Sequence, residues 1–309
     1  MVTQVKPHPK AGSGKQSRDP RWTRNGLEMR ILPVLRWLVI ACLLIVTLFP
    51  FYYMTILSVR PLSAVLQDPG ALWVSFSEFS IETYISVLQS PSEGGQGFLT
   101  FMGNSALVAL GTVAVTLLLA VPGSYAISRL QFFGRRKISA LFLAVYLFPS
   151  ILLAIPLFVF FTRIGLRGEL VGLLFVYVAQ VVPVSIYMLR NYFETIPTSL
   201  EEAAAIDGGS RLTIMWRISL PLAMPAIISN ALFIFMIAWN EFLFALLFLV
   251  ESRENWTVSL GLSQLAGSIE VPTTILMAGS VILTLPIIII FFASERLLTE
   301  GLTAGAEKG

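Results

Sequence analysis

Few side chains in this sequence could do chemistry, and the most unusual group lies between two long apolar segments. Residues 202–225 read EAAAIDGGSRLTIMWRISLPLAMP and include two acidic residues, two arginines and a Gly-Gly pair. Such polarity is unexpected in a largely apolar chain unless a soluble partner binds there. We therefore treat 202–225 as the main candidate for an interaction site.

Sets of residues for catalysis or metal binding are missing from the sequence. The chain has one histidine, His8, and one cysteine, Cys42, which excludes an intrachain disulfide and a metal site built on these residues. Residues 12–17, GSGKQS, imitate a phosphate-binding loop, but they lack its first glycine and the Ser or Thr after its lysine. We expect no enzyme activity, cofactor, metal or ATP site in this chain, so its energy must come from another subunit.

The elements that position the candidate site are expected to be membrane helices. The chain has 309 residues, of which 56% are hydrophobic and 13% charged, with a mean hydropathy of +0.79. Soluble domains carry about twice this charged fraction. A helix needs about 20 apolar residues to cross the hydrocarbon core. Six stretches qualify: 37–57, 104–127, 138–161, 170–189, 226–248 and 274–292.

Proline occurs in five of these six stretches, which predicts packed and bent helices. A proline removes one backbone hydrogen bond, and neighbouring helices can satisfy the freed carbonyl inside a membrane. The fold class that we predict is an all-α integral membrane protein with six transmembrane helices and a cytoplasmic loop between the fourth and the fifth.

Basic residues predict the orientation. Lys and Arg concentrate in the N-terminal tail, at 129–137 and at 190–217, whereas the opposite loops carry few: Arg60, Arg163, Arg167 and Arg253. Under the positive-inside rule, both termini and the 196–225 loop are then cytoplasmic in a multi-pass membrane protein, which the family resemblance described below places in the bacterial inner membrane. Residues 1–30 are expected to be a disordered basic tail, for which a nucleic-acid or lipid-binding role is a minor alternative.

The loop itself is predicted to be two short helices. Thr198 and Ser199 each precede a glutamate by three residues, which is typical of capping boxes, and Gly208-Gly209 should end the first helix. Ser210 should cap the second helix, whose apolar residues Leu212, Met215 and Trp216 share one face by helical spacing. An amphipathic hairpin on lipid headgroups is the alternative. We favour docking to a protein, because anionic lipid headgroups would repel the two acidic residues.

At this point the sequence resembles a known family. Glu202-Ala203-Ala204, Asp207-Gly208 and Ile218-x-Leu220-Pro221 resemble the EAA loop of type I ABC importer permeases at the expected spacing. Residues 239–242, WNEF, are similar to the sugar-importer branch. The end of the chain, 301–309, resembles the second, maltose-type permease, although Glu307 stands where an apolar residue is usual.

The resemblance implies a transport complex. It implies a heterodimer with a second permease, two ATP-binding subunits that bind ATP and Mg, and an extracytoplasmic solute-binding protein, with no nucleic acid. It divides the chain into a tail (1–30), a first transmembrane helix and periplasmic loop (31–98), a five-helix core (99–293) and a cytoplasmic C-terminal tail (294–309). Membrane lipid is the surrounding partner.

The function implied is ATP-driven import of a sugar, such as a maltose- or trehalose-type disaccharide. Glycerol 3-phosphate or another small solute is an alternative cargo. A stand-alone secondary transporter is less favoured, because neither internal repeats nor broken helices are clear in the sequence. The residues expected to couple to the ATPase are Glu202, Ala203, Ala204, Asp207, Gly208, Leu212, Met215 and Trp216.

A second candidate site lies within the predicted fifth helix. A carboxylate deep in a membrane is costly, so Glu241 should face the helix bundle or a wet cavity. Glu241 could hydrogen-bond a sugar in the translocation path, or make a structural contact between helices, and the sequence leaves both open. Asn240, Trp239 and, in the fourth helix, Gln180 are further candidates for the path.

Overall fold

The computed structural model describes residues 24–268 and 271–306, which divide into two compact units, Met1–Tyr52 and Tyr53–Gly309. The described residues are helical, with no strand among them. The first unit holds most of helix α1 (Arg24–Ser58), so the predicted tail 1–30 is already helical from Arg24. Good helix formers at 27–30 explain the early start. The rest of that predicted tail lies outside the described residues.

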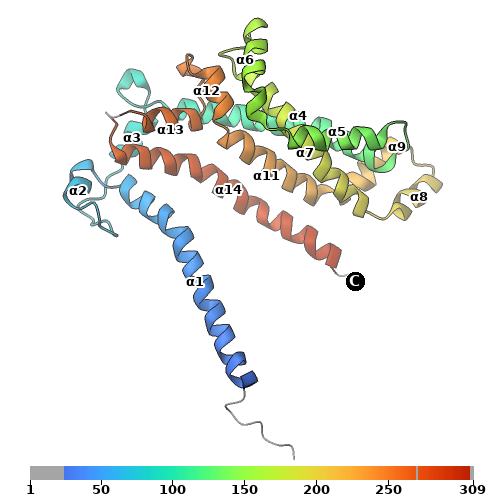
Figure 1. The fold of residues 1–309 in the computed structure, drawn as a ribbon, viewed down its shortest axis with the longest axis horizontal. Helices are drawn as coiled ribbons and strands as arrows, with labels where there is room; N and C mark the ends of the chain where they lie inside the picture. Colours follow the sequence, from blue (N-terminus) through green and yellow to red (C-terminus); the bar gives the residue numbers. More distant parts are fainter. Residues whose placement is uncertain (1–23, 269–270, 307–309) are drawn as a thin grey trace, which may run out of the picture. The chain divides into compact units, whose positions relative to one another are not determined.

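Four long helices form the centre of the second unit. They are α4 (Phe98–Arg129), α7 (Leu170–Thr195), α11 (Met224–Asn240) and α14 (Thr273–Ala306). Helix α4 packs against α7 and α11, and α11 packs against α14, so the four run side by side (Figure 1). Helices α4 and α7 both finish next to the 196–225 segment, and we call this side of the second unit the loop end.

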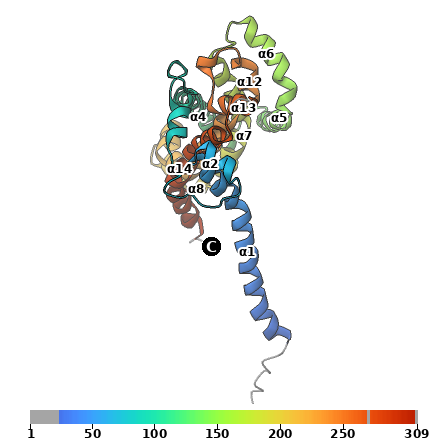
Figure 2. The same ribbon diagram turned by 90° about the vertical axis from the view of Figure 1, so that its left-hand side faces the viewer.

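The predicted third span is broken. Helix α5 (Arg135–Leu147) is followed by a 3-10 turn (Ser150–Leu153) and by α6 (Ala154–Arg163), and the two halves meet at 87° (Figure 2). Pro149 explains the break, because the residue before a proline disfavours helical backbone, and Phe148 is extended with ψ 127°. By contrast Pro50, Pro122, Pro183 and Pro286 lie inside continuous helices.

The fifth span also differs from the prediction of one helix over 226–248. Helix α11 ends at Asn240, Glu241 has an extended backbone, and a separate helix, α12, covers Leu243–Leu249. Within the described residues, four helices are long and apolar enough to cross a membrane, or up to six if each of two bent pairs counts as one span. The all-α membrane fold is therefore confirmed, whereas the broken helices remove one sequence argument against a secondary transporter.

The opposite end of the second unit carries several short helices, none of which the sequence analysis predicted. They are α2 (Leu62–Gln67), α3 (Glu82–Leu88), a 3-10 turn (Pro91–Glu93), a second 3-10 turn (Arg253–Asn255) and α13 (Val258–Ala266). Arg60, which is 1% exposed, fastens the first of them: its guanidinium donates to Glu78 Oε2 at 3.0 Å and to the carbonyls of Asp68 and Ala64.

Two clusters of buried side chains hold the long helices together. The larger one contains Phe98, Leu173, Tyr177, Trp239 and Phe248. The smaller cluster lies at the loop end and joins α4 and α7 to the 196–225 segment through Tyr125, Phe193, Ile196 and Met215. This second cluster is the apolar floor on which the candidate site is built.

Candidate functional site

The loop is a helical hairpin, as predicted. Helix α8 (Thr198–Ile206) leads to a turn, then to α9 (Arg211–Ile214), a π-helix (Met215–Ser219) and the short α10 (Leu220–Leu222). Gly208 has a φ of 83°, which favours glycine, and its N–H bonds the carbonyl of Ala205. Ser210 caps α9 as predicted, since its Oγ accepts from Thr213 N.

The outer face of the loop carries most of the predicted coupling residues. Glu202, Ala203, Asp207 and Gly208 are exposed, and Ala204 is half-buried. Leu212 and Trp216 are 66% and 58% exposed, and Ile206, which the sequence analysis did not select, is 87% exposed. We use the term outer face for these residues: Glu202, Ala203, Ile206, Asp207, Gly208, Leu212 and Trp216.

Met215 does not belong to this face, so its placement beside Leu212 and Trp216 is wrong. Its side chain is 8% exposed and packs in the apolar cluster with Tyr125, Phe193 and Ile196. Residues 215–219 form a π-helix, which turns less per residue than an α-helix. A prediction based on regular α-helical spacing therefore misjudged which residues face outward.

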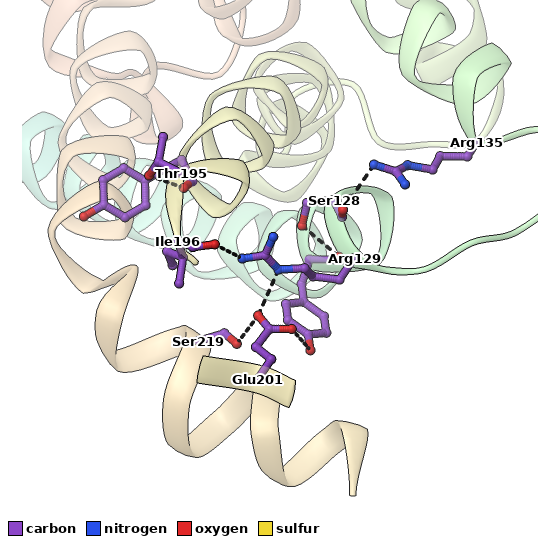
Figure 3. Close-up of polar contacts among 9 residues, drawn as sticks. Ser128, Arg129, Arg135, Thr195, Ile196, Glu201 and Ser219 are labelled. Carbon is purple, nitrogen blue, oxygen red and sulfur yellow. Dashed lines mark hydrogen bonds and ion pairs between the residues drawn. The ribbon is translucent and has the colours of Figure 1, made fainter. Parts of the chain in front are cut away.

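A buried ion pair fixes the loop to the bundle (Figure 3). Arg129, the last residue of α4, donates from Nε to Glu201 Oε1 at 2.9 Å and from Nη2 to the carbonyl of Ile196 at 2.6 Å. Their side chains are 9% and 13% exposed. The pair therefore joins α4 to α8 and to the junction that follows α7.

Further hydrogen bonds satisfy the Glu201 carboxylate. Ser219, in the π-helix, donates from Oγ to Oε1 at 2.8 Å, and Tyr125, in α4, donates from its hydroxyl to Oε2 at 3.3 Å. Burying charges is costly unless they are paired and hydrogen-bonded, and both conditions hold here. Three parts of the chain, namely α4, α8 and the π-helix, thus converge on one carboxylate.

The predicted capping boxes at the start of α8 are wrong. Helix α8 begins at Thr198 after Pro197, and no side chain caps its first turn. Glu201 cannot return to the start of the helix, because its carboxylate is bound to Arg129. Sequence reasoning selected Glu202 from the motif and missed Glu201, Arg129, Tyr125 and Ser219. The available signal was Arg129 at the end of an apolar helix, where a charge needs a partner.

A groove lies beside the ion pair. It has a volume of about 430 Å³ and is lined by Gln131, Thr198, Glu202, Ala205 and Arg211 in addition to the network residues. Its polar lining and its position between the end of α4 and the outer face suit a charged side chain of a partner. Both acidic and basic side chains of this chain line the groove.

The residues of the second candidate site, Trp239, Asn240, Glu241 and Gln180, do not form a single surface. Glu241 is half-buried, and its carboxylate accepts from Phe244 N at 2.9 Å, from Ala245 N at 3.2 Å and from Tyr177 hydroxyl at 2.6 Å. These are the contacts of a residue that caps α12 and ties it to α7. Of the two possibilities left open by the sequence, the geometry favours the structural contact.

The neighbours of Glu241 differ from one another. Trp239 is 2% exposed, its Nε1 donates to the carbonyl of Leu283 in α14, and its ring stacks on Phe235. This burial removes Trp239 from the candidates for a substrate path. Asn240 is exposed, and its side chain donates to the carbonyl of Met236 one turn earlier.

Gln180 lies apart from Glu241 in a different environment. It lines a cavity of about 220 Å³ with Tyr146, Phe148, Ser150 and Phe244, next to the break between α5 and α6. Its buried Nε2 has no hydrogen-bond partner among the residues that the structure describes. Of the four predicted path residues, Gln180 is the one that combines a place in the lining of this cavity with a buried, unpaired amide nitrogen.

No group of three or more His, Cys, Asp or Glu side chains within the described part of the chain could hold a metal ion. The fold and the loop define a multi-pass membrane protein with a structured polar hairpin at one end. Its known relatives identify it further.

Residues 117–303 match the model of a family described as the inner membrane component of binding-protein-dependent transport systems. The chain is 38% identical to the inner membrane ABC transporter permease protein YcjP of Escherichia coli over 87% of its length and 94% of the relative. It is 37% identical to the trehalose/maltose transport system permease protein MalG of Thermococcus litoralis, over 93% and 99% of the two chains.

Among solved structures, the fold is similar to a chain of a bacterial ABC transporter that imports the acidic polysaccharide alginate. The TM-score is 0.72 at 24% identity, over 90% of this chain and 99% of the other. The chain belongs to the family of binding-protein-dependent transport system inner membrane components. It is a multi-pass permease of the inner membrane, and its predicted family is confirmed.

Proposed function

We propose that the chain is one of two permeases in an ATP-driven importer that takes up a disaccharide or a short oligosaccharide. The relative most informative about the cargo is the trehalose/maltose permease, which aligns over nearly its whole length. The second permease forms the other half of the translocation path, and a solute-binding protein delivers the sugar. ATP and Mg bind to two ATPase subunits, which carry out the hydrolysis.

The observation that carries the coupling part of this proposal is the outer face of the loop. Ile206, Leu212 and Trp216 are apolar, largely exposed and placed on one rigid hairpin next to the acids Glu202 and Asp207. Exposed apolar side chains with a polar rim are typical of protein interaction sites. We assign this face to docking on an ATPase subunit, with Glu202, Ala203, Asp207 and Gly208 among its contacts and the half-buried Ala204 beneath them.

The orientation follows from the same assignment. An ATPase that uses cellular ATP must lie in the cytoplasm, so the loop end is cytoplasmic. The basic residues at this end, Arg129, Arg135, Arg136, Lys137 and Arg190, agree with the positive-inside rule. Helices that cross the membrane six times then place both termini in the cytoplasm.

For passage of the sugar we retain Gln180 and, as a weaker candidate, the exposed Asn240. Gln180 lines a cavity beside a break in a membrane helix, where water can enter, and its buried amide nitrogen would serve as a donor to a sugar hydroxyl if its side chain turned into that cavity. Glu241 contributes to this region indirectly, because its carboxylate accepts hydrogen bonds from backbone N–H groups at the start of α12.

The test is reconstitution of the complete complex in proteoliposomes. We expect the ATPase subunits to co-purify with the two permeases, and trehalose or maltose with the solute-binding protein to stimulate ATP hydrolysis. Stimulation by sn-glycerol 3-phosphate instead would correct the cargo but keep the coupling. Sugar uptake by this chain alone, without ATP or other subunits, would overturn the proposal.

A further inference from the structure

The loop continues α7 through Ile196 and Pro197, and it continues into α11 through α10. Besides these chain connections, the apolar cluster around Met215 packs the loop on α4 and α7. The ion pair Arg129–Glu201 adds a polar attachment to α4 from a different part of the sequence. Among the ion pairs of the described residues, it alone joins the loop to a membrane helix.

The two chain connections contain natural hinges. Pro197 and Ala223, at the borders of the loop, lie outside regular α-helix, so rotation about these residues could absorb a movement of the hairpin. Nothing comparable relieves the ion pair, since Arg129 is in the last turn of α4 and Glu201 is in the first turn of α8. A displacement of α8 therefore acts directly on the end of α4.

The chemistry of the pair makes this attachment stiff. Arg129 donates to two acceptors and the Glu201 carboxylate accepts from three donors, so neither side chain can rotate without losing several bonds. Both side chains are also largely shielded from water, which strengthens their electrostatic attraction.

The adjacent residues Glu201 and Glu202 point in different directions because of their positions on the helix. Successive residues of an α-helix point about 100° apart. Glu201 therefore turns toward α4, while Glu202 is exposed on the outer face, where the proposed ATPase docks. Force applied at the outer face reaches Glu201 through one turn of α8.

We propose that the Arg129–Glu201 pair is the strut that carries a movement of the loop to α4. This inference rests on the proposed function, because it assumes that an ATPase moves the loop. Both residues are positioning residues: they contact neither ATP nor sugar. Since α4 packs along α7 and α11, a displacement of α4 moves the centre of the bundle.

The experiment measures whether the loop and α4 move as one body. Nitroxide labels are placed at Arg217 in the π-helix and at Leu119 in α4, both exposed, after the single cysteine is removed by Cys42→Ser. Distances are recorded by pulsed electron paramagnetic resonance in the complete complex in nanodiscs, without nucleotide and with ATP, Mg²⁺ and vanadate.

With the strut intact, we expect one narrow distance distribution that is the same in both nucleotide states. Glu201→Gln, which removes the charge but keeps a similar shape, should broaden the distribution and make it shift with nucleotide. Arg129→Lys keeps the charge but cannot reach both Glu201 and Ile196, so it should also broaden the distance distribution. If Glu201→Gln fails to assemble, the result for Arg129→Lys tests the proposal. The matched control is Glu194→Gln, which removes a half-exposed carboxylate from the Arg190 pair at the same end of α7.

A narrow and unchanged distribution in Glu201→Gln would overturn the strut, because chain connections would then suffice. So would a nucleotide-dependent distance in the intact chain. Failure of the proposed function looks different, since the ATPase subunits would then be absent from the purified complex before any distance is measured.

Discussion

At the scale of single residues, Glu201 and Glu202 show how a motif can draw attention to one of two neighbours. The motif points to Glu202, which is exposed on the outer face. Glu201, one position earlier, forms the buried pair with Arg129. Local sequence contains no information about Arg129, which is 72 positions away. Long-range pairing of this kind is therefore invisible to motif reasoning.

Replacing each glutamate in turn should separate stability from docking. Glu201→Gln leaves the Arg129 guanidinium with an uncharged partner, so we expect a loss of about 2–3 kcal/mol of stability. Glu202→Gln should leave stability unchanged and weaken binding of the ATPase subunits. The measurements are thermal unfolding of the purified permease in detergent and co-purification of the ATPase. Equal unfolding temperatures for both variants would refute the distinction.

Gly208 offers a matched pair of substitutions. Both Gly208 and Gly134 have positive φ, 83° and 86°, and neither has an atom within 4 Å of an added Cβ. Alanine at either position should therefore cost about 1–2 kcal/mol from backbone strain alone. Only Gly208→Ala changes the outer face, so only this variant should lose ATPase subunits on purification. Equal retention in both variants would separate the turn at Gly208 from docking.

At the scale of elements, the long apolar runs allowed the main helices to be predicted. The predicted spans at 104–127, 170–189 and 274–292 lie within α4, α7 and α14, although each helix extends beyond the apolar run. Hydropathy detects the part of a helix that needs lipid, and it cannot detect a polar or amphipathic continuation. For the same reason α2, α3 and α13, which lie outside the apolar runs, were not predicted.

The break between α11 and α12 had a different cause. Residues 226–248 contain neither proline nor glycine, so the sequence predicted a continuous helix. The helix ends because the Glu241 carboxylate bonds the first free N–H groups of α12 and the hydroxyl of Tyr177. A glutamate that caps a helix from within an apolar run has no distinctive local pattern.

Substitution of Glu241 tests its structural role. Glu241→Ala should remove the cap of α12 and the bond to Tyr177, and lower stability by about 2–4 kcal/mol. The adjacent Asn240→Ala, which removes one bond to a carbonyl in its own helix, should be close to neutral and serves as the control. Thermal unfolding in detergent compares the two. If Glu241→Ala unfolds normally but abolishes uptake, Glu241 returns to the translocation path.

At the scale of the whole molecule, composition and charge predicted the membrane class and one orientation. The class follows from summed properties, which survive local errors such as the broken third span. Orientation depends on the membrane and on the partners, and the distances within one chain give no information about either. It therefore stays a prediction.

Labelling with a membrane-impermeant maleimide checks the orientation. In the Cys42→Ser background, a cysteine at Phe76, which is fully exposed at the opposite end, should react in right-side-out vesicles. A cysteine at Phe133, which is 98% exposed at the loop end and lies outside the outer face, should react only after detergent is added. The reverse pattern would invert the topology and would make docking to a cytoplasmic ATPase impossible.

The break at Pro149 has a consequence for the life of the chain in a cell. Irregular backbone is tolerated within a bilayer only when protein or water covers it. Around the break, Tyr146, Ile151 and Leu152 are about half exposed or more, beside the cavity that holds Gln180. A copy synthesised in excess of the companion permease that we propose would leave this defect open to lipid. Its abundance should therefore follow that of the companion, with surplus copies removed by membrane proteases.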